Sequence, residues 1–184
     1  MSWELDNMKR LFAVAALLVL PSLTLSKPAP ADPWQPLQFL MGEWTAEGSG
    51  DPGQGSGSFS FRYDLDRKIL IRLNSSDYPA TKDHPAFSHG DLMVIYPDTK
   101  QSGLRAIYFD NEGHVIEYKV NVPAEGTVEM VSDAVQGSPR FRLTYTKADN
   151  GGLAVKFEIA PPDHPEAFKT YLEGRARPKK RASN

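Results

Sequence analysis

The chain has no cysteine among its 184 residues. It therefore cannot form a disulfide, and it cannot carry a lipid on a cysteine after a signal sequence. The folded protein must be held together by its apolar core alone. A chain of this length, with 40% hydrophobic residues, is long enough to bury such a core in one domain.

Long apolar runs and an excess of one charge are also missing. The apolar run from Leu11 to Leu20 is too short to cross a bilayer comfortably, and Pro21 interrupts it. The formal net charge is −2, and the basic tail at 178–184 contains no aromatic residue. These features predict no nucleic-acid partner and no membrane span once a signal sequence has been cleaved.

The first 31 residues have the pattern of a secretory signal peptide followed by a linker. Lys9 and Arg10 precede the apolar run, and small residues and prolines follow it up to Ala31. Cleavage after Ala31 and cleavage after Ser26 both fit, and an uncleaved anchor is the alternative. The pattern predicts a periplasmic or secreted protein.

The remaining sequence alternates apolar and polar residues with the period of β-strands. These alternations recur about every ten residues, with turn residues between them. The predicted strands are 43–49, 58–65, 69–73, 92–96, 104–109, 115–122, 128–135, 141–145, 153–159 and 168–176. Closing such a meander removes its exposed edges. We therefore predict an all-β domain over 32–177, an antiparallel up-and-down barrel of about ten strands with a short N-terminal helical segment at 34–41.

The stretch from Phe39 to Gly50 reads Phe-Leu-Met-Gly-Glu-Trp-Thr-Ala-Glu-Gly-Ser-Gly. Gly42 is expected to end the helical segment, and Trp44 is expected to plug the closed end of the barrel. The stretch resembles the opening signature of lipocalin-like calycin domains, in particular the nitrobindin-related barrels and their uncharacterised secreted bacterial relatives. Similarity continues in Tyr63-Asp-Leu-Asp-Arg-Lys68 and in the last strand. The resemblance implies a small β-barrel with a ligand cavity.

Nitrobindins bind haem through a histidine in a last-strand motif, His-Leu-x-Ala-x-Leu. The matching stretch here is Tyr171-Leu-Glu-Gly-Arg-Ala176, so Tyr171 stands at the histidine position. Tyrosinate can ligate ferric haem, but a tyrosine here is more commonly a wall aromatic. No cofactor is predicted, and haem at Tyr171 is kept as the alternative.

In a meander, connections alternate between the two ends of the barrel. This places all four histidines, which are His84, His89, His114 and His164, at one end together with several aspartates. Imidazole and carboxylate suit a divalent metal, but none of these pairs has helical spacing and the His-Pro dipeptides are explained by turns. They are weak metal candidates, and solvated loop histidines are the favoured interpretation.

Arginines alternate with apolar residues in several predicted strands. They are Arg62, Arg72, Arg105, Arg142 and Arg175. If the apolar stripe faces inwards, they lie on the solvated face, which is the expected arrangement. If some face the lumen, a guanidinium and a tyrosine hydroxyl would anchor an anionic head group. The candidate ligand-binding pairs are Arg142 with Tyr145 and Arg175 with Tyr171, and the second is preferred because its members share a strand face.

Signals for catalysis are sparse. The glycines at 48–57 lack the Gly-Lys-Ser/Thr ending of a phosphate loop, and no serine lies in a nucleophile-elbow pattern. We predict an exported, non-catalytic barrel that binds a small, largely apolar ligand, with an anionic head group as one option. The alternatives are a haem protein with redox or isomerase activity and an envelope interaction module whose barrel is filled.

Overall fold

A computed structural model describes residues 32–47, 56–82 and 85–180. Four sequence-based predictions fall outside these ranges. They concern the signal peptide at 1–31, most of the glycine-rich hairpin, His84 and the last residues of the basic tail.

The described chain forms one short helix and ten strands. The 3₁₀ helix η1 spans Gln35–Leu40. The strands are β1 (Gly42–Glu47), β2 (Ser56–Asp64), β3 (Ile69–Tyr78), β4 (Phe87–Pro97), β5 (Leu104–Asp110), β6 (Val115–Ala124), β7 (Thr127–Ser132), β8 (Arg140–Lys147), β9 (Leu153–Ala160) and β10 (Lys169–Pro178). This confirms the predicted fold class and the helical segment at its start.

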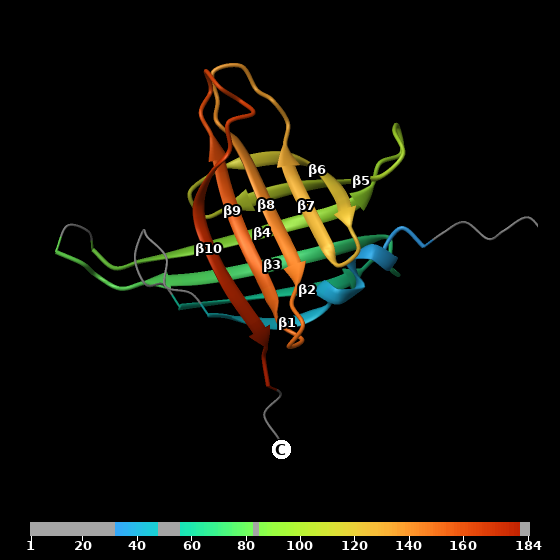
Figure 1. Cartoon of the computed structure of the whole chain (residues 1–184), viewed down its shortest axis with the longest axis horizontal. Coiled ribbons are helices and arrows are strands. Elements are labelled where there is room, and N and C mark those ends of the chain that lie inside the picture. Colours follow the sequence, from blue (N-terminus) through green and yellow to red (C-terminus); the bar gives the residue numbers. More distant parts are fainter. Residues whose placement is uncertain (1–31, 48–55, 83–84, 181–184) are drawn as a thin grey trace, which may run out of the picture. The chain divides into compact units, whose positions relative to one another are not determined.

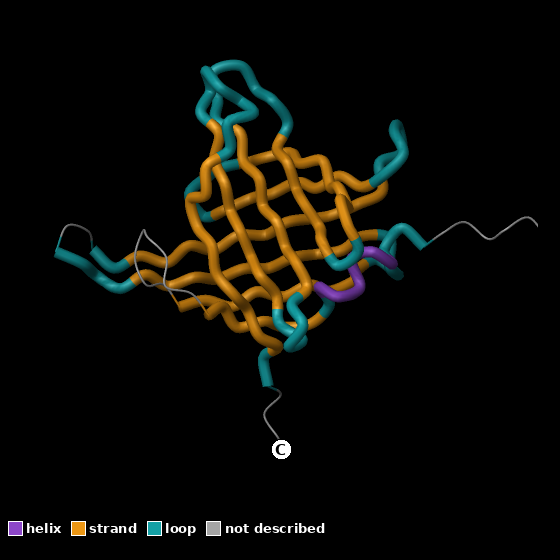
Figure 2. Tube along the Cα trace, in the orientation of Figure 1, coloured by secondary structure: helices purple, strands orange, loops and turns teal. Residues whose placement is uncertain are grey.

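The strands form a closed antiparallel barrel in which each strand pairs with the next along the chain (Figure 1). The barrel closes between β1 and β10, where Thr45 lies opposite Arg177. In Figure 2 the strands of the near wall cross those of the far wall at a steep angle. Because each strand runs antiparallel to the next, successive strands finish at alternating ends of the barrel. We call the end at which β1, β3, β5, β7 and β9 finish the mouth, and the other end the closed end.

Strands β3 and β4 extend well beyond the predicted 69–73 and 92–96. They continue as a hairpin towards the mouth, where the rings of Tyr78 and Phe87 stack with centroids 4.5 Å apart. The missed residues are mainly polar, so no apolar alternation marked them as strand.

Strand β3 also faces the opposite way from the prediction. Leu70 and Arg72 are buried, and Leu73 is exposed. Arg72 lies beside Phe61 of β2 and Met93 of β4, which both face the interior, and neighbours across a pleated sheet share a face. The predicted solvated position of Arg72 was therefore wrong.

The closed end is filled by aromatic and aliphatic side chains from η1 and β1. Trp44 is buried, donates its indole N–H to the Leu40 carbonyl at 2.8 Å, and packs parallel to Phe59. Trp34 donates its indole N–H to the Arg67 carbonyl at 2.9 Å, which ties η1 to the turn between β2 and β3. Both indoles thus bury apolar surface while their polar atom is satisfied.

Gly42 joins η1 to β1 with a φ of +113°. A side chain there is strained although the space around it is open, since no atom lies within 4 Å of the position that a Cβ would take. We expect Gly42→Ala to lower the free energy of unfolding by about 1–2 kcal/mol, the cost of an L-residue in the left-handed region. Urea denaturation measures this change.

Gly90 provides the matched control, because its φ is not positive and its added Cβ would meet only the Asn74 carbonyl at 4.0 Å. Gly90→Ala should change stability by well under the Gly42→Ala effect. Equal effects of the two substitutions would contradict the role given to Gly42.

Candidate functional site

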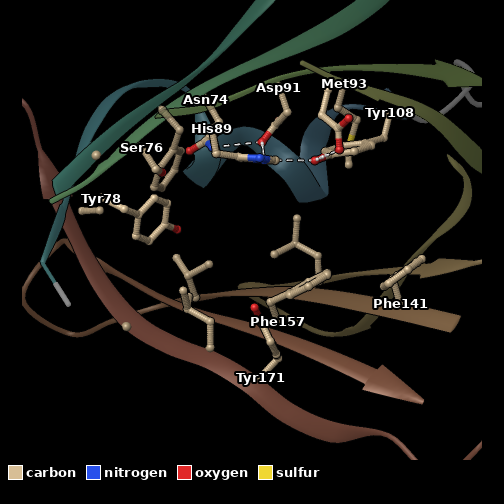
Figure 3. A pocket seen from close by; sticks show the side chains of 18 of the residues that line it. Asn74, Ser76, Tyr78, His89, Asp91, Met93, Tyr108, Phe141, Phe157 and Tyr171 are labelled. Carbon is tan, nitrogen blue, oxygen red and sulfur yellow. Dashed lines mark hydrogen bonds and ion pairs between the residues drawn. The ribbon is translucent and has the colours of Figure 1, made fainter. Parts of the chain in front are cut away.

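A cavity of about 470 Å³ occupies the lumen between the apolar core and the mouth. This volume lies within the range of about 300–1,000 Å³ that is usual for small-molecule sites. Its lining reaches from Phe59 and Met93 near the core to Tyr78 and Phe87 on the mouth hairpin. The cavity has two unlike walls, which Figure 3 shows above and below the open space.

The first wall is polar and is built by β3, β4 and β5. Because side chains alternate along a strand, Asn74, Ser76 and Tyr78 of β3 face the lumen together, beside His89 and Asp91 of β4 (Figure 3). We call this side the polar wall. Tyr108 and Asp110 of β5 and His114 after it complete the polar wall.

Arg72 lies beneath the polar wall, and only 7% of it is exposed. Its Nε donates to the Tyr145 hydroxyl at 2.7 Å, and its guanidinium forms a buried ion pair with Asp91. Burial by itself lowers the pKa of Arg72, but Tyr145 and Asp91 outweigh it and raise the pKa above its ordinary value. Arg72 is therefore a charged group whose hydrogen bonds are made inside the protein.

Asp91 links Arg72 to the residues that face the cavity. Its second oxygen accepts a hydrogen bond from the Asn74 amide at 2.9 Å and lies 3.4 Å from His89 Nε2. No buried side-chain nitrogen or oxygen in the described residues lacks a partner. The charge pair is thus fully satisfied, as a buried pair must be to persist.

His89 of β4 contacts Tyr108 of β5 and Glu112 in the connection after β5. Its Nδ1 lies 2.8 Å from the Glu112 carboxylate, and its Nε2 lies 3.1 Å from the Tyr108 hydroxyl. Tyr108 donates its one hydroxyl proton to Asp110, so its oxygen is the acceptor for His89 Nε2. Both ring nitrogens are therefore engaged.

Asp110 is the buried carboxylate of the polar wall on β5, where it lies opposite Asp91 of β4. It accepts hydrogen bonds from the His114 backbone at 2.8 Å and from Tyr108 at 3.2 Å, and its carboxylate lies 2.8 Å from His114 Nδ1. Burial raises the pKa of Asp110, but these hydrogen bonds outweigh it and hold the pKa below its ordinary value. The carboxylate is therefore ionised at neutral pH.

The opposite wall is apolar and is built mainly by β8 and β9, with part of β10. Its lining residues are Phe141, Leu143, Val155, Phe157, Ile159 and Leu172. Phe141 and Phe157 stack with centroids 5.9 Å apart, so they present a continuous aromatic surface to the lumen (Figure 3). We call this side the apolar wall.

Tyr171 and Arg175 both border the cavity on β10, but the structure does not place them on one face of a regular strand. A bulge between Thr170 and Leu172 breaks the alternation, so the parity argument that joined them does not hold. Tyr171 is 50% exposed at the mouth and packs edge-on against Phe157 at 6.0 Å. Arg175 is exposed on the rim.

Arg142 and Tyr145 lie on opposite faces of β8. The Arg142 guanidinium is on the outer side, where it donates to Glu158 at 2.6 Å and lies 4.3 Å from the Phe168 ring. This partner lowers the pKa of Glu158. Tyr145 is fully buried beneath the cavity as the partner of Arg72. The structure thus pairs Tyr145 with Arg72, not with Arg142.

The histidines that the structure describes separate into two kinds. His89 and His114 line the cavity, whereas His164 is exposed in the connection after β9, 3.7 Å from Asp163. Within residues 32–47, 56–82 and 85–180, no group of three or more His, Cys, Asp or Glu could hold a metal ion. Metal binding thus has no support from these residues.

Sequence reasoning placed His89, His114 and two aspartates of the polar wall, Asp91 and Asp110, at one end of the barrel, but it did not identify the wall itself. Arg72 was assigned to solvent, and Asp91, Asn74 and Tyr108 were not considered as a set. A signal was present in the polar alternation Arg72, Asn74, Ser76, which has the same period as the apolar face before it.

The closed ten-stranded antiparallel barrel with a lumen cavity is consistent with a calycin-like fold. A scan against models of protein families finds no match, and a search of curated proteins finds none either. The class of the protein is thus given by its fold and cavity, and the relation to nitrobindins stays a prediction.

The buried ion pair between Arg72 and Asp91 leads to a prediction about stability. We expect Arg72→Met to lower the free energy of unfolding by about 3–5 kcal/mol, because it leaves the Asp91 charge buried without its partner. Adding Asp91→Leu should restore most of this loss, since an apolar pair of similar volume replaces the ion pair. Urea denaturation of the single and double variants tests this, and equal destabilisation of both would contradict it.

Three lumen tyrosines predict how stability changes at high pH. Burial raises the pKa of Tyr108, Tyr118 and Tyr145 in the folded protein, and nearby Asp91 adds to the effect. Above about pH 10 the unfolded chain loses phenolic protons that the folded protein keeps. The free energy of unfolding should therefore fall as pH rises, by up to about 1.4 kcal/mol per pH unit for each tyrosine.

Denaturation at a series of alkaline pH values measures this slope. The variant Tyr118→Phe removes one of the three phenols, so its slope should be shallower than that of the unchanged protein. Identical slopes would show that Tyr118 does not have a raised pKa.

Proposed function

We propose that the protein binds a small amphipathic molecule in the barrel lumen and acts as a binding protein. The observation that carries this proposal is the cavity of about 470 Å³ between a polar wall and an apolar wall. A molecule with an apolar body and one polar side would contact both walls at once. Ligand sites usually combine a hydrophobic surface with a few precisely placed polar groups.

Export to the periplasm or the cell exterior is part of the proposal. It is supported by the sequence pattern of residues 1–31. In the part of the chain that the structure describes, no helix is both long and apolar enough to cross a membrane.

Haem is the alternative ligand, and the residues fit it poorly. A tyrosinate ligand needs a neighbour that favours the ionised phenol, such as a cation within hydrogen-bonding distance. In the described residues the Tyr171 hydroxyl makes no hydrogen bond, and its ring contact is with Phe157. His89 has both ring nitrogens engaged with other side chains.

An envelope interaction module with a filled barrel is the other alternative. The cavity argues against a filled barrel. The outer face does carry a row of apolar residues in register across four strands, which are Leu73, Leu92, Phe109 and Val115. An outer row of this kind is compatible with a ligand in the lumen, so it does not favour the module by itself.

Filling the cavity should abolish binding. Val155 faces the lumen on the apolar wall, whereas its neighbour Ala154 is exposed on the outer face. We expect Val155→Trp to weaken binding of the neutral apolar dye N-phenylnaphthylamine at least about tenfold, because the indole occupies the space of the ligand. Dye fluorescence during titration reports the affinity.

Ala154→Trp is the matched control, since it adds the same side chain one residue away on the outside. It should leave dye affinity unchanged. Equal binding by both variants would show that the dye does not enter the lumen.

Native mass spectrometry of the protein from its own host would weigh a retained ligand and the mature chain together. A Soret band that is lost in Tyr171→Phe would favour haem instead.

A further inference from the structure

The charges that line the cavity are mostly negative. The lining includes five carboxylates and one arginine, which are Glu47, Asp91, Asp110, Glu112, Glu173 and Arg175. Asp91 and Asp110 lie deep, with only 4% of each side chain exposed, whereas Glu47 and Glu112 are more than half exposed at the rim. The negative charge thus extends from the mouth to the floor of the cavity.

Two further arginines reduce this excess without cancelling it. Arg72 neutralises Asp91 from beneath the lining, and Arg177 pairs with Glu47 from the outer side of β10. Even with both included, five carboxylates stand against three guanidinium groups among the described residues around the cavity. Carboxylates therefore remain in excess over guanidinium groups.

Arg72 is not available to an anionic ligand. Its hydrogen bonds go to Tyr145 and Asp91, and it does not belong to the cavity lining. A ligand carboxylate placed at this wall would lie beside Asp91 and Glu112, and such like-charge contacts inside a partly enclosed site are unfavourable. The anionic head group considered from the sequence is thus disfavoured by the structure.

Aromatic rings give a second, independent indication of a cation. Eight of them line the cavity, which are Phe59, Tyr78, Phe87, Tyr108, Tyr118, Phe141, Phe157 and Tyr171. Ring faces attract ammonium groups, and aromatic cages combined with nearby carboxylates are a known way to hold quaternary ammonium. At the mouth, Tyr78 and His89 lie on the polar wall (Figure 3), where Tyr78 stacks on Phe87 and His89 contacts Glu112.

We infer that the ligand of this cavity is an amphipathic cation, with an amine or quaternary ammonium head group and an apolar body. The head group lies along the polar wall, close to the carboxylates, and the body lies against Phe141, Phe157 and Leu143 of the apolar wall. This inference rests on the proposed binding function, and it names the chemical class of the ligand.

Three probes with the same chain and different head groups test the charge preference. They are decyltrimethylammonium, decanol and decanoate, each used below its micelle concentration at neutral pH. Displacement of N-phenylnaphthylamine from the full chain gives their affinities. We expect the ammonium to bind about tenfold more tightly than decanol, a ratio of the size that cation–π and charge contacts provide, and decanoate to bind most weakly.

Two double variants separate the mouth charges from the overall charge of the protein. Glu112→Gln with Glu173→Gln removes two carboxylates of the rim while keeping their shape. Glu117→Gln with Glu129→Gln removes two carboxylates of the outer surface, which pair with Arg105 and Arg142. The ratio of ammonium to decanol affinity should fall about fivefold in the rim variant and stay unchanged in the outer variant.

The outcomes distinguish this inference from the proposed function. The cationic ligand is overturned if decanoate binds as tightly as the ammonium or more tightly. It is also overturned if the ratio of ammonium to decanol affinity falls equally in both double variants. Either outcome leaves binding in the lumen intact. If none of the three probes displaces the dye, or if Val155→Trp does not weaken the dye, the proposed function itself is overturned.

Discussion

The structure depends on one buried interaction, the ion pair of Arg72 with Asp91 and its hydrogen bond to Tyr145. This group lies where the packed part of the lumen ends and the cavity begins. Below it the interior is apolar, with Phe61, Leu70 and other buried side chains. A charge in that position requires a nearby carboxylate and hydrogen-bonding groups, because an unpaired guanidinium inside a barrel costs several kcal/mol. The pair therefore keeps polar atoms at the cavity floor and gives the lumen one polar wall.

The two walls follow from how the strands divide the barrel. Strands β3 to β5 place hydrogen-bonded polar side chains on their inner face, including Asp91 of β4 and Asp110 of β5. Strands β8 and β9 place aromatic and aliphatic side chains opposite them. A ligand in such a space is oriented by the polar wall and desolvated by the apolar wall. In the proposed function the excess of carboxylates favours a cationic head group, and the aromatic rings favour a cation as well.

Much of the fold could be predicted from the sequence, and little of the site. Period-two alternation and turn residues located all ten strands, and the spacing implied a closed meander. Two features were not visible in that pattern. The bulge in β10 separates Tyr171 from the face of Arg175, and a bulge depends on backbone geometry with the neighbouring strand. The polar ends of β3 and β4 form strands because they pair with each other, although they lack apolar alternation.

The sequence by itself determined the class of fold, because local alternation, turn chemistry and the absence of long helices are properties of neighbouring residues. It also placed Gly42 and Trp44 at the start of the first strand. Only the tertiary structure decided which face of β3 points inwards. Leu70 and Ile71 are equally apolar, so alternation alone allows both registers, and the choice depends on packing against Phe61 and Met93 across the sheet. That choice brings Arg72 to Asp91 and Tyr145, residues far apart in the chain, and it creates the polar wall on which the proposed function rests.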